Sequence, residues 1–272
     1  NRRILHTADA NDMLKGKTAL VTGSTSGIGL GIARVLAARG ADIVLNGFGD
    51  AAEIERLREG LASEHGVAVR YEAADLTRVE EIESLVRRVE AQSGAVDILV
   101  NNAGIQHTAP VQEFPVDRWD AVIALNLSAA FHAMRCALPA MQARGWGRIV
   151  NIASAHGLVA SVNKSAYVAA KHGLIGLTKV VALENARSGI TCNAICPGWV
   201  LTPLVQKQID ARAAAHGLSA EQAKDELLGE KQPSMEFVTP QQLGELAAFL
   251  CSEAAAQVRG SAYVMDGGWT AQ

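Results

Sequence analysis

Short apolar runs alternate with longer amphipathic stretches along most of the chain, and this alternation constrains the fold more than any other feature. A short apolar run is typical of a strand buried on both faces, and apolar residues at helical spacing indicate a helix packed on one side. Strands are expected at 18–22, 42–45, 68–73, 96–101, 147–152, 190–195 and 261–265. Helices are expected at about 28–36, 53–65, 79–92, 119–144, 167–188 and 242–251. The pattern predicts an α/β fold: a Rossmann-type, doubly wound parallel sheet of seven strands with helices on both faces.

The length of 272 residues fits one domain of this class. We expect residues 13–272 to form it, with residues 1–12 a leader or cloning remnant, because the first strand pattern begins at Lys17. Residues 199–240 break the alternation: they are polar and helical, with a capping-box pattern at Ser219 and Gln222. A helical pair inserted after a strand predicts a small lid over a site.

The net charge of −3 comes without a dominant basic patch, which argues against a nucleic-acid binder. No apolar run approaches the length of a membrane span, so a membrane partner is not expected. The four cysteines show no C-x-x-C spacing, and Cys192 and Cys196 fall in an apolar run that predicts a buried strand. No metal is expected, and the location is predicted to be the reducing cytoplasm.

A glycine-rich turn, Thr22-Gly-Ser-Thr-Ser-Gly-Ile-Gly29, follows the first strand and opens the first helix. Glycines let the backbone approach a pyrophosphate, and the helix N-terminus supplies free N–H groups and a positive dipole end. Between a strand and a helix, this motif predicts a dinucleotide site. Its expected cofactor contacts are Gly23, Thr25, Ser26, Gly27 and Ile28.

The end of the second strand bears on which dinucleotide is bound. An NAD site usually has an Asp or Glu there for the ribose, whereas this chain has Asn46-Gly-Phe-Gly49. No Arg or Lys in residues 46–52 could pair with a ribose phosphate, which favours NAD over NADP. Phe48 either shields the adenosine or is a loop aromatic that caps the core.

Two later strand ends complete the predicted nucleotide site. Asp75 and Leu76 follow the third strand, where an adenine edge would lie, although Asp75 could also be a helix N-cap. Asn101-Asn-Ala-Gly104 ends the fourth strand, and its small residues would let the cofactor lie against the backbone. The expected contacts there are Asn102, Ala103 and Gly104.

A candidate catalytic set follows the fifth strand. Tyr167 and Lys171 are four residues apart and therefore share one helix face. An ammonium beside the phenol would favour phenolate, so Tyr167 could act as acid or base near neutral pH. Ser154 could hold the substrate oxygen as its charge changes. Asn126 lies in the long preceding helix, and alone it would be a polar helix residue satisfied locally.

In this order, these pieces resemble the classical short-chain dehydrogenase/reductase family over about residues 14–269. The resemblance implies that Ser154 positions substrate, Tyr167 transfers the proton, Lys171 tunes it and binds the nicotinamide ribose, and Asn126 holds a relay water. It also implies a homotetramer joined through helices 119–144 and 167–188. It adds four residues bordering the nicotinamide: Pro197, Gly198, Val200 and Thr202.

Residues 104–110, 153–167, 196–200 and 266–270 resemble a subgroup of this family, the bacterial D-3-hydroxybutyrate dehydrogenases. This closer resemblance implies NAD-dependent interconversion of D-3-hydroxybutyrate and acetoacetate, and a carboxylate site at Gln106, His156, Lys164 and Gln208. Taken singly, Lys164 would be a surface lysine and His156 a satisfied loop histidine. Trp199 and Trp269 either enclose the methyl side of the substrate or are core or subunit contacts.

Two other functions remain open from the residues. One is oxidation or reduction of a different small alcohol or ketoacyl substrate by the same machinery. The other is a catalytically silent NAD-binding sensor, which would be free to lose Ser154, Tyr167 or Lys171, although this chain has all three.

Overall fold

In the computed structural model, which describes residues 12–271, seven parallel strands hydrogen-bond into one sheet. The strand order is β3-β2-β1-β4-β5-β6-β7, so the predicted α/β class and strand number are confirmed. The leader expected at residues 1–12 lies almost wholly outside the described residues. The strands are β1 Thr18–Val21, β2 Asp42–Leu45, β3 Val69–Tyr71, β4 Ile98–Asn101, β5 Gly147–Ile152, β6 Ile190–Pro197 and β7 Ala262–Met265.

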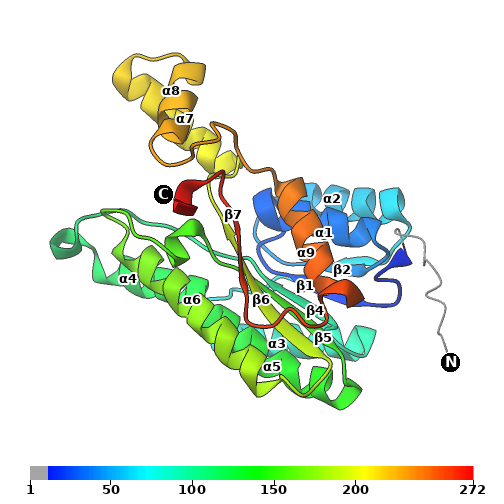
Figure 1. Ribbon diagram of the computed structural model, residues 1–272. Coiled ribbons are helices and arrows are strands. Elements are labelled where there is room, and N and C mark those ends of the chain that lie inside the picture. Colours follow the sequence, from blue (N-terminus) through cyan, green and yellow to red (C-terminus); the bar gives the residue numbers. More distant parts are fainter. Residues whose placement is uncertain (1–11, 272) are drawn as a thin grey trace.

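Helices cover both faces of the sheet (Figure 1). Two separate clusters of buried aliphatic residues, one on each face, hold the layers together, as the apolar stripes of the helices require. One layer contains α1 Gly27–Ala38, α2 Ala51–His65 and α9 Pro240–Cys251. The other contains α3 Val79–Ser93, α4 Val116–Ile123, α5 Ala129–Arg144 and α6 Ser165–Glu184.

The helix predicted as continuous over 119–144 differs in the structure. It begins earlier, at Val116, and a π-helical turn, Ala124–Ser128, separates α4 from α5. A π-helical turn inserts one residue into the helix and shifts the direction of its side chains, and such turns are frequent at functional sites. Hydrophobic periodicity does not reveal it, because the apolar pattern continues on both sides.

The expectation that no apolar segment reaches membrane-span length was wrong by length and composition. Val116–Arg144 and Ser165–Glu184 are both long and apolar enough, with mean hydropathies of 1.4 and 1.2 in their most apolar windows. Only 39% and 44% of those windows are buried inside the fold. Their inner faces pack on the sheet through residues such as Ala133, Met134 and Leu174, so the core accounts for part of their apolar character.

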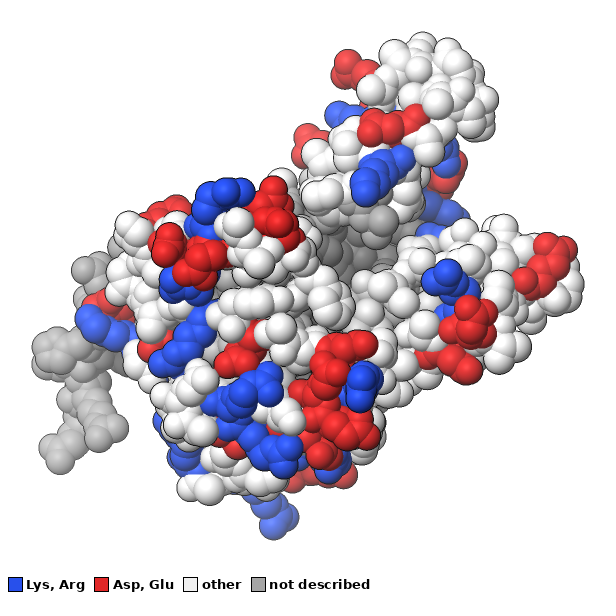
Figure 2. Space-filling view, turned by 180° about the vertical axis from the view of Figure 1, so that it is seen from behind, with Lys and Arg blue, Asp and Glu red and all other residues white. Residues whose placement is uncertain are grey.

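The segment that breaks the alternation forms two helices, α7 Pro203–His216 and α8 Ala220–Gly229, which project from the body (Figure 1). The capping box predicted at Ser219 and Gln222 is present at the start of α8. A small cluster of its own, built on Val205, Ile209 and Leu227, joins the pair. Figure 2 shows a hollow between this projecting lobe and the body, with charges of both signs mixed over the surrounding surface.

The strand order fixes where a ligand would lie. It reverses between β1 and β4, and in an open parallel sheet the crevice at such a switch point, at the carboxyl ends of the strands, is the usual binding place. Every predicted strand-end motif therefore meets at one edge of the sheet.

Candidate active site

The glycine-rich turn lies against the end of β4. Gly23 has φ +61°, and a Cβ there would come within 2.9 Å of the Ala103 Cα, so only glycine fits. Gly27 has φ +56° and opens α1. The N-cap residue of α1, Ser26, makes no side-chain cap hydrogen bond, so N–H groups of the first turn remain for a ligand.

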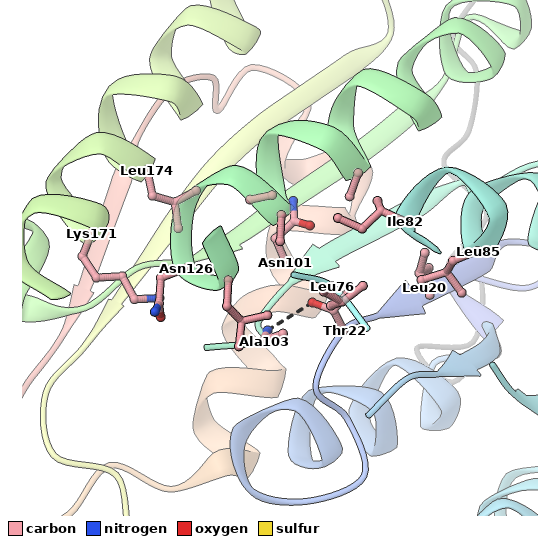
Figure 3. Close-up of a pocket in the computed structure, with 14 residues that line it drawn as sticks. Leu20, Thr22, Leu76, Ile82, Leu85, Asn101, Ala103, Asn126, Lys171 and Leu174 are labelled. Carbon is pink, nitrogen blue, oxygen red and sulfur yellow. Dashed lines mark hydrogen bonds between the residues drawn. The ribbon is translucent and has the colours of Figure 1, made fainter. Parts of the chain in front are cut away.

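A threonine and an asparagine brace this turn. The Thr22 hydroxyl accepts hydrogen bonds from the backbone N–H groups of Asn102, at 3.0 Å, and Ala103, at 3.1 Å. Figure 3 shows the bond from Ala103. The Asn102 amide donates back to the carbonyls of Thr22, at 2.9 Å, and Gly23, at 3.0 Å. These bonds fix the two glycine-containing loops relative to each other before any ligand binds.

The residue that replaces the usual ribose-binding carboxylate has a structural role. Asn46 is buried, and its amide donates to the carbonyls of Glu72, at 3.1 Å, and Ala74, at 3.4 Å. It is therefore committed to joining the ends of β2 and β3. Phe48 is 73% exposed and lines a cavity at the carboxyl ends of the strands, so the alternative that it caps the core is wrong.

Asp75 does not cap a helix. The N-cap residue of α3 is Arg78, and Asp75 instead accepts hydrogen bonds from the Thr77 N–H, at 2.9 Å, and hydroxyl, at 2.7 Å. The bonds from Thr77 lower the pKa of the Asp75 carboxyl. The N-cap alternative for Asp75 is thus wrong, and the carboxylate stays ionised at the edge of the cavity.

One cavity of about 520 Å³ collects nearly all the predicted cofactor residues. Val200 is the exception, because it lines the neighbouring cavity instead. Thr77 and Ile105 also line the cavity and were not predicted, since each is one or two residues past a motif. Predicted residues in the lining are Gly23, Thr25, Ser26, Gly27, Ile28, Phe48, Asp75, Leu76, Asn102, Ala103, Gly104, Tyr167, Lys171, Pro197, Gly198 and Thr202.

Ser154, Tyr167 and Lys171 meet where this cavity joins a second one. Ser154 and Tyr167 line both cavities. The Ser154 hydroxyl accepts the His156 N–H at 3.1 Å, which fixes Ser154 to the turn that follows it. The Lys171 Nζ lies 5.5 Å from the centre of the Tyr167 ring and donates to the Ile152 carbonyl at 2.8 Å. One helix, α6, thus carries both ionisable groups into the site.

Burial controls the charges of these groups. It raises the pKa of the Tyr167 phenol, with the Ser154 hydroxyl acting in the opposite direction. It lowers the pKa of the Lys171 amine to about 8. The expected lowering of the Tyr167 pKa by Lys171 is not seen in the protein alone, because burial raises this pKa and only the Ser154 hydroxyl opposes it. The phenol is therefore protonated at neutral pH.

Asn126 enters the site from the π-helical turn. Its amide nitrogen donates to the carbonyls of Ile105, at 2.8 Å, and Val122, at 2.9 Å. Its Oδ1 is buried with no hydrogen-bond partner among the described residues. Figure 3 shows Asn126 and Lys171 extending toward each other, and both line the same cavities. The free amide oxygen can accept a hydrogen bond from a water. The interpretation of Asn126 as a polar helix residue satisfied locally therefore accounts for its amide nitrogen but not for its oxygen.

The second cavity, of about 150 Å³, brings together every residue predicted for the substrate. They come from the loops after β4, β5 and β6, from the start of α6, from α7 and from the C-terminal turn. These residues are Gln106, Ser154, His156, Lys164, Tyr167, Trp199, Gln208 and Trp269.

The cavity has one cationic side and one aromatic side. Trp199 and Trp269 stack with ring centres 6.2 Å apart, and Lys164 Nζ lies 5.4 Å from the Trp199 ring centre. His156 packs edge-on against Trp269 and its Nε2 is 2.9 Å from the Ser161 hydroxyl, a partner that the sequence did not reveal. Both tryptophans thus face the cavity, as one of their two predicted roles requires.

His156 and Lys164 differ in charge at neutral pH. Burial, helped by the charges of Lys164 and Lys231, lowers the pKa of His156 to about 4, so the imidazole is neutral and can donate one hydrogen bond. Burial also lowers the pKa of the half-buried Lys164. A small anion in this cavity would meet the Lys164 amine and neutral hydrogen-bond donors, and would offset part of that desolvation.

Known proteins are similar to this chain in sequence. A sequence model described as short chain dehydrogenase matches residues 17–213. The chain is 63% identical to the D-beta-hydroxybutyrate dehydrogenase of Cupriavidus necator, over 96% of this chain and 100% of that protein. It is 54% identical to the protein of the same name from Rhizobium meliloti, over 94% of this chain and 99% of that one.

A solved structure shares the fold as well. The L-sorbose reductase of Gluconobacter frateurii, complexed with NADPH and L-sorbose, superposes with a TM-score of 0.91 at 34% identity, covering 96% of this chain and 99% of that one. The family match spans the glycine-rich turn and the Ser154, Tyr167 and Lys171 positions, and the relatives cover nearly the whole chain. This chain therefore belongs to the short-chain dehydrogenase family.

Proposed function

We propose that this protein oxidises D-3-hydroxybutyrate to acetoacetate, reversibly, with NAD as the hydride acceptor. The observation that carries the proposal is the 150 Å³ cavity, in which a lysine, a neutral histidine and two glutamines lie beside Ser154 and Tyr167. Such donors suit a carboxylate, and the stacked tryptophans suit a short apolar end. The names of the two relatives described above support the same substrate.

The residues fit a nicotinamide nucleotide. The Gly23–Gly27 turn and the uncapped start of α1 would hold its pyrophosphate, and the lining from Asn102 to Gly104 lets the ring lie close to the backbone. When bound, the nicotinamide would receive the hydride, with its electron pair, from carbon-3 of the substrate. Lys171 is the only cation among the residues that line the 520 Å³ cavity. No basic side chain near Asn46 would therefore select a ribose phosphate.

The chain's own groups would handle the proton. For the oxidation, the Tyr167 phenol would first release its own proton through a water on the Asn126 Oδ1. The Tyr167 Oη would then take the hydroxyl proton as the carbonyl forms, while the Ser154 hydroxyl donates to the same oxygen. Lys171 and a water on the Asn126 Oδ1 would carry that proton away. Closure of the lobe carrying Gln208 would exclude water and complete the carboxylate site.

Initial rates test the substrate and the cofactor together. The purified protein is supplied with NAD and each enantiomer of 3-hydroxybutyrate, then with NADP, and reduced nucleotide is followed. We expect turnover of the D form with NAD only, and Tyr167→Phe as a matched variant should lose at least about a hundredfold in rate. Preference for NADP would reject the cofactor assignment.

The same assay separates the two alternatives. Faster turnover of another small alcohol or a ketoacyl substrate would retain the Tyr167–Lys171 chemistry and reject the hydroxy acid. The solved relative with L-sorbose favours keeping a polyol in the panel. Nucleotide binding without any turnover would support the silent sensor instead.

A further inference from the structure

A buried glutamine, Gln232, lies where the chain returns from α8 to α9. It is 1% exposed. Its Oε1 accepts the backbone N–H of Trp199 at 2.7 Å, across 33 residues of sequence, and its Nε2 donates to the Glu236 carbonyl. Both halves of the amide are therefore satisfied by backbone, and one of these bonds holds the peptide of a substrate-cavity residue.

The glutamine also packs between two loops that could not approach it with larger residues. A Cβ on Gly198 would lie 2.5 Å from the Gln232 Oε1 and 2.8 Å from the Asp266 Cα. A Cβ on Gly267 would lie 2.6 Å from the Gln232 Cγ. Gly198 immediately precedes Trp199, and Gly267 is two residues before Trp269, so the glutamine contacts the backbone next to both tryptophans.

Hydrogen bonds within the C-terminal loop hold Trp269 in a fixed position relative to Gly267. The Asp266 carboxylate accepts hydrogen bonds from the N–H groups of Gly268, at 3.0 Å, and Thr270, at 2.8 Å, and from the Thr270 hydroxyl at 2.7 Å. These bonds close a tight turn around Trp269. The Gly267 carbonyl accepts the Ser234 N–H at 3.0 Å, and Gln232 packs against the same glycine, so the segment that carries Gln232 holds the turn on which Trp269 stands.

Gln232 is not among the residues that line the substrate cavity, so any effect on substrate passes through the residues that it holds. We propose that Gln232 is a positioning residue for the substrate cavity, which fixes the stacked Trp199–Trp269 pair at the aromatic wall. This inference rests on the proposed function for its kinetic test. The relative position of the two tryptophan rings does not depend on which substrate is used.

A second buried amide provides a matched control. Asn193 is also 1% exposed, and its amide bridges backbone in the same way, donating to the Val258 carbonyl at 2.7 Å and accepting the Ser261 N–H at 3.0 Å. It joins β6 to the segment before β7, away from the substrate cavity. Gln232→Met and Asn193→Leu each remove two hydrogen bonds, and each keeps a side chain of similar length or branching.

Kinetics separate positioning from general stability. Q232M should raise KM for the hydroxy acid about tenfold, because a loose aromatic wall weakens substrate binding, while kcat falls less and the NADH Kd stays within about twofold. N193L should lower Tm comparably and leave KM near that of the unmodified protein. Equal KM changes in both variants would overturn the proposal.

A spectroscopic measurement makes the test independent of the substrate. The chain has four tryptophans, and 5-fluorotryptophan labelling gives one fluorine resonance for each. In Q232M the Trp199 and Trp269 resonances should shift or broaden while those of Trp119 and Trp146 stay in place. In N193L the Trp199 and Trp269 resonances should not move.

The outcomes remain distinct if either hypothesis fails. If the unmodified protein does not turn over D-3-hydroxybutyrate, the proposed function fails, and the fluorine spectra still decide the role of Gln232. If Q232M does not fold, Gln232→Glu retains an oxygen for the Trp199 N–H and loses the donor to Glu236, and it should shift the same two resonances less. Unchanged Trp199 and Trp269 resonances in a folded variant would reject the positioning role.

Discussion

The role inferred for Lys164 changes once the surroundings of its side chain are known. It is the N-cap residue of α6, half-buried beside Trp199, and it is the cation of the substrate cavity. Taken alone in the sequence, it would be interpreted as a surface lysine. Its position in the same cavity as His156, Gln106 and Gln208 is what connects a common residue type to carboxylate binding.

Removing that charge gives a direct test of carboxylate recognition. Lys164→Ala should raise KM for the acid at least tenfold, because a charge-assisted hydrogen bond contributes about 1.5–3 kcal/mol. NADH affinity, measured by fluorescence, should stay near normal. Lys179→Ala, at an exposed lysine of the same helix, is the control. An unchanged KM in K164A would remove the carboxylate from the assignment.

Lys171 predicts a pH dependence of stability whose sign follows from burial. Its pKa is lowered to about 8, so between about pH 8 and the usual lysine value the unfolded chain holds a proton that the folded chain has released. Stability should therefore rise with pH in that interval, relative to a variant without the group.

Thermal unfolding of the nucleotide-free protein checks this sign. Tm of the unmodified protein minus that of Lys171→Met should become more positive by a few degrees between pH 7.5 and pH 10. Lys179→Met should follow the unmodified protein throughout. A difference independent of pH would mean that the buried amine is not destabilised by desolvation.

At the scale of elements, regular strands and helices could be predicted because each carries a local pattern. The limits of β2 and β5 match the prediction, since each strand has a core of branched apolar residues that begins and ends beside turn-forming or small residues. The π-helical turn could not be predicted, because one inserted residue leaves the apolar pattern of α4 and α5 unchanged. Gln232 was also missed, because Trp199, the cavity residue that it holds, is 33 residues away in sequence and no motif surrounds the glutamine.

The π-helical turn yields its own prediction. A Cβ on Gly104 would collide with the Asn126 Oδ1, so Gly104→Ala should displace the oxygen that is free to hold a water. We expect kcat to fall about tenfold or more, with a smaller change in KM. Gly60→Ala is the matched control, since nothing lies within 4 Å of that Cβ in α2, and it should raise Tm by about 2–4 °C. A normal kcat in G104A would argue against the relay role of Asn126.

For the whole molecule, two of its most apolar helices have outer faces that the single chain leaves exposed. Phe131 of α5 is 45% exposed, and Val180 and Leu183 of α6 are 50% and 76% exposed. Large exposed apolar patches usually mark interaction sites. We propose that these faces join subunits in a homotetramer, which would bury the apolar surface that the fold itself does not use.

Light scattering after size exclusion measures this directly. The unmodified protein should elute at four times the chain mass of 28.6 kDa. The double variant Phe131→Glu and Leu183→Glu should shift to smaller species, because burying unpaired carboxylates at an interface is strongly unfavourable. Ser63→Glu adds a charge at an exposed position of α2 and should leave the mass unchanged. A monomer in the unmodified protein would disprove the assembly. A tetramer that survives the double variant would place the interface on another face, and the exposed side of α5 and α6 would then need a different partner.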